Sequence, residues 1–177
     1  VNGQPWPQNY EGDHGSEKYV TVNEAVGKSL NTVPARMIDE MLHLDTCYSY
    51  VNNKFHLNLT PSDMTLSGMA CGGTHTGVTT LEMAAAYAVF GNGGRYYEPR
   101  LYTKVTDQKG NIILEKNTSP KMAVSEDTAT VMNHLLRQVV YGSRGTGTAA
   151  ASYVSNMPIY AKTGTSNDQN DLWFVGG

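Results

Sequence analysis

Four residues near the C-terminus, Lys162-Thr163-Gly164-Thr165, combine a cation, two hydroxyls and a glycine in a pattern that suits an anion site. Lys162 supplies a full positive charge, and the two threonines supply hydroxyl donors. Gly164 has no Cβ, so a ligand can approach the backbone closely. The apolar residues 159–161 predict a short strand that carries these groups to the edge of a cleft. A strand end with a solvated lysine is the alternative interpretation, and residues upstream must decide between the two.

Size and composition fit one domain or a large part of one. The chain has 177 residues, of which 40% are hydrophobic and 16% are charged, and this is adequate for a core. The net charge of −3 and the pI near 5.9 argue against a nucleic-acid partner, which normally leaves a basic stripe. The longest apolar run, Ala84 to Phe90, is far too short to span a bilayer.

The sequence predicts no cofactor and no metal site. Cys47 and Cys71 are isolated and lack the Cys-x-x-Cys spacing of zinc and redox sites, although a disulfide between them stays open. His43 and Cys47 can share one helix face, but two ligands do not make a metal site. We interpret all three as ordinary structural residues.

A second polar group, Ser29-Leu30-Asn31, lies between two predicted helices. Residues 1–20 lack periodicity and predict a loop. Thr21 and Glu24 form a capping box for a short helix that ends near Lys28. Ser29 and Asn31 therefore lie at a helix–helix junction, and in an extended junction their side chains point roughly the same way.

Asn31 or Thr32 is expected to cap the helix that follows this junction, with Pro34 tolerated in its first turn. Residues 44–78 predict an irregular segment, and a long loop in a compact domain is often functional. Helical spacing predicts one buried apolar face on this helix, formed by Val33, Met37, Ile38, Met41 and Leu42.

The next part of the chain carries a strong helix signal. Thr79 and Glu82 form a second capping box, which predicts a helix over 81–90 that stops at the glycine-rich residues 91–94. Ser125 is expected to cap the following helix. The apolar face of that helix is predicted to comprise Ala129, Met132, Leu135, Leu136 and Val139.

Two hairpins and a glycine-rich link complete the prediction. Residues 100–106 and 111–114 alternate like paired strands. Residues 142–147 read as a flexible link without the order of a phosphate-binding loop. Residues 159–165 and 172–176 predict an antiparallel hairpin, in which Trp173 and Phe174 are expected to pack into the core.

Several of these blocks occur in the order found in one enzyme family. The blocks are Ser29-Leu30-Asn31, residues 77–94, Lys162-Thr163-Gly164-Thr165 and residues 173–176. They resemble the transpeptidase domain of class A penicillin-binding proteins, the bifunctional cell-wall synthases. That family has the motifs Ser-x-x-Lys, Ser-Asp-Asn and Lys-Thr-Gly, and here the second reads Ser-Leu-Asn. The resemblance implies an α/β (α+β) fold of the penicillin-binding-protein/β-lactamase type, with helices and part of an antiparallel sheet.

The sequence departs from the family pattern at one point, because no Ser-x-x-Lys occurs in it. In the family this motif precedes the Ser-x-Asn motif and carries the acylated serine. We therefore expect residues 1–177 to be part of one transpeptidase domain that is truncated at both ends. The nucleophile is then supplied from an upstream segment or a second chain, and the fragment alone is expected to be inactive.

The resemblance also implies roles for individual residues. Ser29 would relay a proton to the leaving nitrogen, Asn31 would position the substrate, and Lys162 would set a positive potential for a carboxylate. Thr163 and Thr165 would bind that carboxylate, and the Thr165 amide would donate to the oxyanion. Gly164 would leave room for a substrate strand.

The implied activity is D,D-transpeptidation: acyl transfer from D-Ala-D-Ala stem peptides through a serine acyl-enzyme, inhibited by β-lactam antibiotics. The implied partners are peptidoglycan stem peptides, β-lactams and the rest of the domain, at the outer face of a bacterial cell membrane. A glycosyltransferase domain would precede it in the parent protein. Two alternatives stay open, a D,D-carboxypeptidase or β-lactamase-like hydrolase and a non-catalytic binding module of the same fold.

Overall fold

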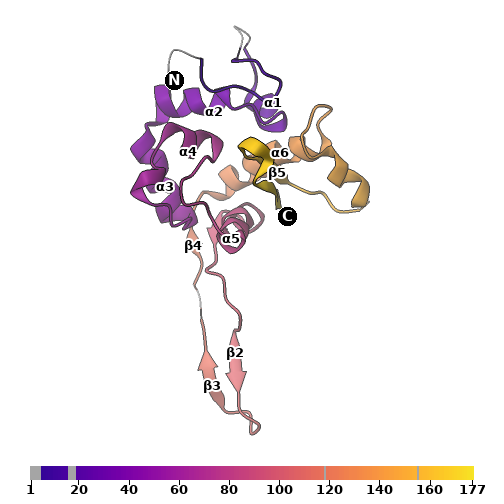
Figure 1. Ribbon diagram of the computed structural model, residues 1–177. Coiled ribbons are helices and arrows are strands. Elements are labelled where there is room, and N and C mark those ends of the chain that lie inside the picture. Colours follow the sequence, from indigo (N-terminus) through magenta and orange to yellow (C-terminus); the bar gives the residue numbers. More distant parts are fainter. Residues whose placement is uncertain (1–4, 16–18, 118, 155) are drawn as a thin grey trace.

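The computed structural model describes residues 5–15, 19–117, 119–154 and 156–177, and shows a helical body from which one β-hairpin projects (Figure 1). This combination of helices with short antiparallel strands agrees with the predicted fold class. The helices are α1 (Val22–Gly27), α2 (Thr32–Met37), α3 (Leu44–Phe55), α4 (Leu66–Cys71), α5 (Thr80–Gly91) and α6 (Glu126–Tyr141), joined by the π-helical turn η1 (Ile38–Leu42) and the 3-10 turns η2 (Pro61–Asp63), η3 (Thr148–Tyr153) and η4 (Asn167–Gln169).

Six strands form three separate two-stranded antiparallel pairs among the described residues. The pairs are β1 (Arg95–Tyr96) with β4 (Lys121–Met122), β2 (Lys104–Thr106) with β3 (Ile112–Glu115), and β5 (Ala161–Thr165) with β6 (Leu172–Gly176). The two predicted hairpins are present as β2–β3 and β5–β6. The first predicted strand of each is shorter than expected, and the β1–β4 pair was not predicted.

Helix α6 organises the body because α1, α5 and β5 all pack against it. The Ser125 hydroxyl accepts a hydrogen bond of 3.1 Å from the Thr128 amide, as the capping prediction requires. The predicted apolar face lies inward, with Ala129, Leu136 and Val139 buried.

Close packing of α1 on α6 depends on Gly27. A Cβ built at Gly27 would lie 3.3 Å from Gln138 Cβ, tighter than ordinary contact. This approach holds the end of α1, and with it the predicted Ser29 corner, against α6.

Helix α5 begins with the predicted capping box and packs beside the hydrophobic core. Thr79 and Glu82 complete the capping box: the Glu82 amide donates to the Thr79 hydroxyl and the Thr79 amide donates to the Glu82 carboxylate. The core beside α5 is a cluster of five buried residues, Val89, Tyr96, Ala123, Val124 and Ala129.

The prediction of an irregular segment over residues 44–78 is wrong, because α3 and α4 occupy much of it. The twelve residues of α3 are mostly polar and all keep some exposure, so the usual apolar stripe of a surface helix is weak. The segment that follows α3 fixes the position of the helix, because Tyr48 Oη and Asn52 Nδ2 each donate a hydrogen bond of 3.0 Å to the Leu59 carbonyl.

The predicted apolar face of the second helix is also wrong at its C-terminal end. Ile38 is buried, but Met41 is 69% exposed and Leu42 is 46% exposed. The cause is η1, where the His43 amide donates to the Ile38 carbonyl, five residues back. A π-helical turn breaks the 3.6-residue period on which the prediction depended.

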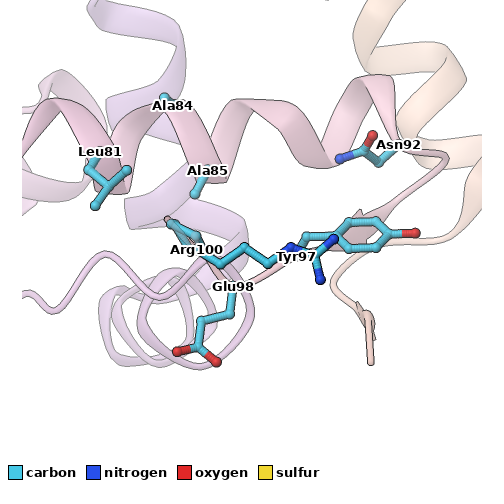
Figure 2. A pocket seen from close by; sticks show the side chains of 8 residues that line it. Leu81, Ala84, Ala85, Asn92, Tyr97, Glu98 and Arg100 are labelled. Carbon is cyan, nitrogen blue, oxygen red and sulfur yellow. The ribbon is translucent and has the colours of Figure 1, made fainter. Parts of the chain in front are cut away.

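An open hollow of about 450 Å³ lies between α5 and residues 97–100, the segment that leads to β2 (Figure 2). Its lining residues come from α5 and the segments that follow it, and they include none of the predicted site residues. They are Leu81, Ala84, Ala85, Asn92, Tyr97, Glu98, Pro99 and Arg100.

Within the described ranges, every helix is too short or too polar to cross a lipid bilayer.

Candidate active site

Ser29 and Lys162, which are 133 residues apart in the sequence, are in direct contact. Lys162 Nζ donates a hydrogen bond of 2.6 Å to Ser29 Oγ and a second one of 3.0 Å to the Thr163 carbonyl. Burial lowers the pKa of Lys162 to about 8, because the ammonium form loses hydration there. The arrangement therefore places a cation that gives up its proton readily next to a serine hydroxyl.

Ser29 adopts a backbone conformation that usually belongs to glycine. Its φ is +56°, in the left-handed region. The Ser29 amide donates to the Val26 carbonyl and the Leu30 amide donates to the Ala25 carbonyl, which is the Schellman ending of α1 with Ser29 at the left-handed position. The junction is therefore a tight turn and not the extended segment considered above. A serine at this position costs about 1 kcal/mol relative to glycine, and this cost favours a functional reason for its hydroxyl.

Asn31 occupies the N-cap position before α2, but its side chain makes no capping hydrogen bond, so the prediction that Asn31 caps the helix is wrong. The cap comes from Asn9, which is buried and whose Oδ1 accepts from the Asn31 amide at 2.8 Å and the Thr32 amide at 3.2 Å. The Asn31 side chain is turned toward the loop, where Nδ2 donates to the Gln8 carbonyl at 2.9 Å.

Asn9 is thus a site-forming residue that sequence reasoning missed. It lies in the segment predicted as loop, 22 residues before Asn31. A capping residue normally precedes its helix directly, so no local sequence pattern predicts that Asn9 caps α2.

The backbone N–H and C=O groups of Thr163 and Thr165 in β5 point away from β6. Tyr160 and Gly177 exchange both of their backbone hydrogen bonds at 3.0 Å. Because such pairs alternate along an antiparallel ladder, the Lys162–Val175 and Gly164–Trp173 pairs are bonded in the same way. The N–H and C=O groups of Thr163 and Thr165 therefore point to the other edge of β5, which is free of a strand partner among the described residues.

The glycine-rich residues 142–147 pack tightly, in contrast to the flexible link that was predicted. The Gly147 amide donates to the Val139 carbonyl at 2.9 Å and the Thr146 amide donates to the Gly27 carbonyl at 3.2 Å. A Cβ at Gly145 would lie 2.3 Å from the Val139 carbonyl oxygen. The glycines thus allow the loop to fold back on α6, and they place Thr146 at the site, where its Oγ1 lies 2.5 Å from Thr163 Oγ1.

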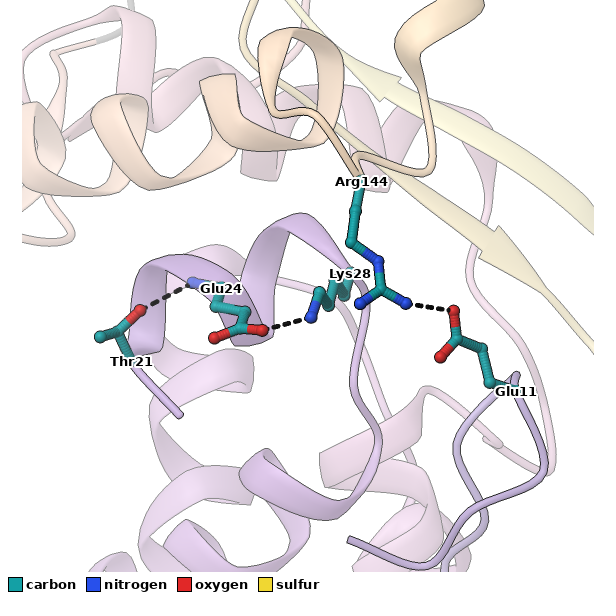
Figure 3. A network of polar contacts seen from close by, with 5 residues as sticks. All are labelled: Glu11, Thr21, Glu24, Lys28 and Arg144. Carbon is teal, nitrogen blue, oxygen red and sulfur yellow. Dashed lines mark hydrogen bonds and ion pairs between the residues drawn. The ribbon is translucent and has the colours of Figure 1, made fainter. Parts of the chain in front are cut away.

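Ion pairs reinforce this side of the site (Figure 3). Arg144 donates to the Glu11 carboxylate at 2.8 Å and so ties the glycine loop to the N-terminal segment. The Thr21 hydroxyl caps α1 by accepting from the Glu24 amide at 3.1 Å. Only half of the predicted capping box forms, because the Glu24 carboxylate pairs with Lys28, which lowers the pKa of Glu24.

The remaining predicted residues are placed as follows. Phe174 is 51% exposed, so its predicted core position is wrong, and with Trp173 it lines a second hollow of about 530 Å³ between α5 and β6. Cys47 and Cys71 are free thiols. Among the described residues there is no group of three or more His, Cys, Asp and Glu side chains that could hold a metal ion.

The whole chain is similar to proteins of one family. Residues 1–176 match the family model of the penicillin binding protein transpeptidase domain. The chain is 40% identical to penicillin-binding protein 1A of Clostridium acetobutylicum over 99% of its own length and 21% of that protein. It is 37% identical to penicillin-binding protein 4 of Bacillus subtilis over 96% of its length and 26% of that protein.

Solved structures share the fold. The D,D-transpeptidase domain of a peptidoglycan glycosyltransferase from Eggerthella lenta superposes with a TM-score of 0.73 at 25% identity, over 95% of this chain and 47% of that one. Penicillin-binding protein 1A from Haemophilus influenzae gives a TM-score of 0.77 at 22% identity, over 99% and 31%. The chain therefore spans about a fifth to a quarter of the curated relatives and less than half of either solved chain.

Proposed function

This chain belongs to the family of penicillin-binding protein transpeptidase domains. We propose that it supplies part of a serine D,D-transpeptidase site: the residues that protonate the leaving group and those that bind the terminal carboxylate of the substrate. The observation that carries the proposal is the 2.6 Å contact between Lys162 Nζ and Ser29 Oγ beside an open strand edge. The reaction is acyl transfer: a serine attacks the penultimate D-alanine carbonyl of a stem peptide, terminal D-alanine leaves, and an amine accepts the acyl group.

Ser29 is the proton relay in this proposal. When the tetrahedral intermediate collapses, Ser29 Oγ gives its proton to the departing nitrogen, and the Lys162 ammonium stabilises the negative charge that develops on the oxygen. The lowered pKa of Lys162 lets a proton return along the same hydrogen bond. The strained backbone of Ser29 is consistent with this role, because strain of this kind collects at functional sites.

The free edge of β5 is the substrate-binding element. The Thr165 amide points to that edge and is the proposed oxyanion donor, and the hydroxyls of Thr163 and Thr165 receive the terminal carboxylate. Gly164 lets an extended peptide lie alongside the strand. Asn31 positions the substrate from the corner, once its amide group exchanges the Gln8 carbonyl for a ligand.

The nucleophilic serine is proposed to lie outside these residues, since no Ser-x-x-Lys occurs within them. The chain is then part of one transpeptidase domain that is completed by further segments of its parent protein. We also propose that the parent acts at the outer face of the bacterial membrane, is anchored there by another segment, and carries a glycosyltransferase domain.

The test is covalent labelling with a fluorescent penicillin, followed by a denaturing gel. The natural protein that contains this chain is expected to be labelled, and residues 1–177 alone are expected to stay unlabelled. In the natural protein, Ser29→Ala and Lys162→Ala should slow labelling strongly. The matched variants Ser152→Ala and Lys109→Ala change exposed residues outside the site and should label normally.

Labelling of the isolated chain would show that the nucleophile lies within these residues. Labelling of the natural protein at the same rate with and without Lys162 would contradict the proposed site.

A further inference from the structure

We propose that Thr146 is a positioning residue that aims the Thr163 hydroxyl at the carboxylate of the ligand. This inference rests on the proposed function and deepens it. Its basis is the 2.5 Å distance between Thr146 Oγ1 and Thr163 Oγ1, which joins the glycine loop after α6 to the anion-binding strand. Thr146 lies outside the four motif blocks that carry the family resemblance.

The direction of this hydrogen bond decides what Thr163 can do. Each hydroxyl has one proton to donate. If Thr163 donates to Thr146, its proton is used, and it can no longer donate to an anion. If Thr146 donates to Thr163, the Thr163 proton stays free, and the bond it accepts polarises its O–H and strengthens its own donation. A carboxylate that accepts from the Thr163 hydroxyl therefore selects the second direction, with Thr146 as the donor.

The chain around Thr146 holds its hydroxyl in place for this task. Its amide donates to the Gly27 carbonyl, two residues before Ser29, and the next amide, that of Gly147, donates to the Val139 carbonyl. Two residues before Thr146, Arg144 pairs with Glu11 (Figure 3). One threonine thus contacts both sides of the site, the end of α1 through its backbone and β5 through its side chain.

The experiment compares acylation of the natural protein by a penicillin with acylation by the methyl ester of the same penicillin, which lacks the carboxylate. Thr146→Val removes the hydroxyl and keeps the shape, and Thr146→Ser restores it. Thr148→Val, at an exposed position two residues away, is the matched control. Because one hydrogen bond to a charged ligand is at stake, we expect Thr146→Val to lower the acylation efficiency of the penicillin about fivefold to tenfold.

The comparison of the two probes separates positioning from a structural role. The ester should react with Thr146→Val and the unmodified protein at the same rate, and Thr146→Ser and Thr148→Val should behave like the unmodified protein toward both probes. Equal losses on both probes, or no loss with the penicillin, would overturn the inference.

A binding measurement distinguishes this inference from the proposed function. The dipeptide D-Ala-D-Ala carries the carboxylate, and its equilibrium affinity can be measured by NMR titration without any acylation. If the unmodified protein is not acylated but its dipeptide affinity falls in Thr146→Val, the transpeptidase function is refuted and the role of Thr146 stands. If the affinity does not depend on Thr146, or the dipeptide does not bind, the role of Thr146 is refuted.

Discussion

Replacing Lys162 by methionine should make the protein more stable while it removes the proposed activity. The pKa of Lys162 falls from its ordinary 10.5 to about 8, because the charge is buried. At 1.36 kcal/mol per pKa unit, burial of the charged form costs about 3 kcal/mol. The two hydrogen bonds of its ammonium, to Ser29 and to the Thr163 carbonyl, offset about 2 kcal/mol of that cost. Methionine keeps a flexible apolar stem, so Lys162→Met should gain about 1 kcal/mol at pH 7.

The pH dependence of this gain has a definite sign. The folded-state pKa of Lys162 lies below the unfolded-state value, so between pH 8 and 10.5 the unfolded chain holds more protons than the folded one. The stability contributed by Lys162 therefore rises with pH across that window. The advantage of Lys162→Met should be largest below pH 8, should vanish just below pH 9, and should become a loss of about 1.5 kcal/mol at pH 10.

Urea denaturation of both proteins at pH 7, 8, 9 and 10 tests this reasoning. The exposed Lys109→Met is the control, and its difference from the unmodified protein should stay flat over the same range. A loss of 2 kcal/mol or more in Lys162→Met at pH 7, or an advantage that grows with pH, would refute the conclusion that Lys162 is a costly buried charge.

Three further substitutions test other parts of the site. Ser29→Gly should be about 1 kcal/mol more stable than Ser29→Ala, because both lose the hydrogen bond from Lys162 and only glycine adopts the left-handed backbone freely. Both variants should slow penicillin labelling, and equal stabilities of the two would contradict the backbone strain. In urea titrations, Asn9→Ala should lower the free energy of unfolding by about 2 kcal/mol, because the amides of Asn31 and Thr32 lose their acceptor, and it should also slow labelling. The exposed Gln8→Ala is the control: it should change the free energy of unfolding by no more than a few tenths of a kcal/mol and leave the labelling rate unchanged. Burial raises the pKa of Asp63, but hydrogen bonds from Thr76, Thr60 and the His75 amide outweigh this and hold it below the ordinary 3.8. The carboxylate thus stabilises the fold above pH 3.8, and Asp63→Asn should lower the thermal midpoint at pH 7, with a difference that narrows as the pH falls below 3.8; a difference independent of pH would refute this.

The parts of the fold that the sequence predicted are those with local signals. Helix α5 carries its capping box and its glycine stop within a few residues, and the β5–β6 hairpin brings its two strands together through a short turn. Helix α3 was missed because its contacts come from a distant return of the chain at Leu59 and not from its own periodicity. The exposure of Met41 follows from a π-helical turn, which the 3.6-residue pattern cannot represent.

The same distinction applies to the site. Ser29, Asn31 and Lys162 were singled out because their blocks occur in the order of one enzyme family, since serine and asparagine at a helix junction are by themselves routine caps. The cap from Asn9 and the hydroxyl of Thr146 depend on tertiary contacts across 22 and 17 residues, and neither residue type is unusual in a loop. The left-handed backbone of Ser29 had no sequence signal either, because glycine is the residue expected there.

The projecting β2–β3 hairpin has a practical consequence. Its tip is a compact turn in which the Asp107 carboxylate accepts from the backbone amides of Lys109 and Asn111, each at 2.8 Å. Figure 1 shows this tip at the far end of the arm, with the helical body at the other end. Exposed tips of this kind accept inserted or attached groups readily. Residues 108–110 therefore offer an anchoring point for a fluorophore or an affinity handle, through which the protein can be followed or immobilised while the free edge of β5 remains unobstructed.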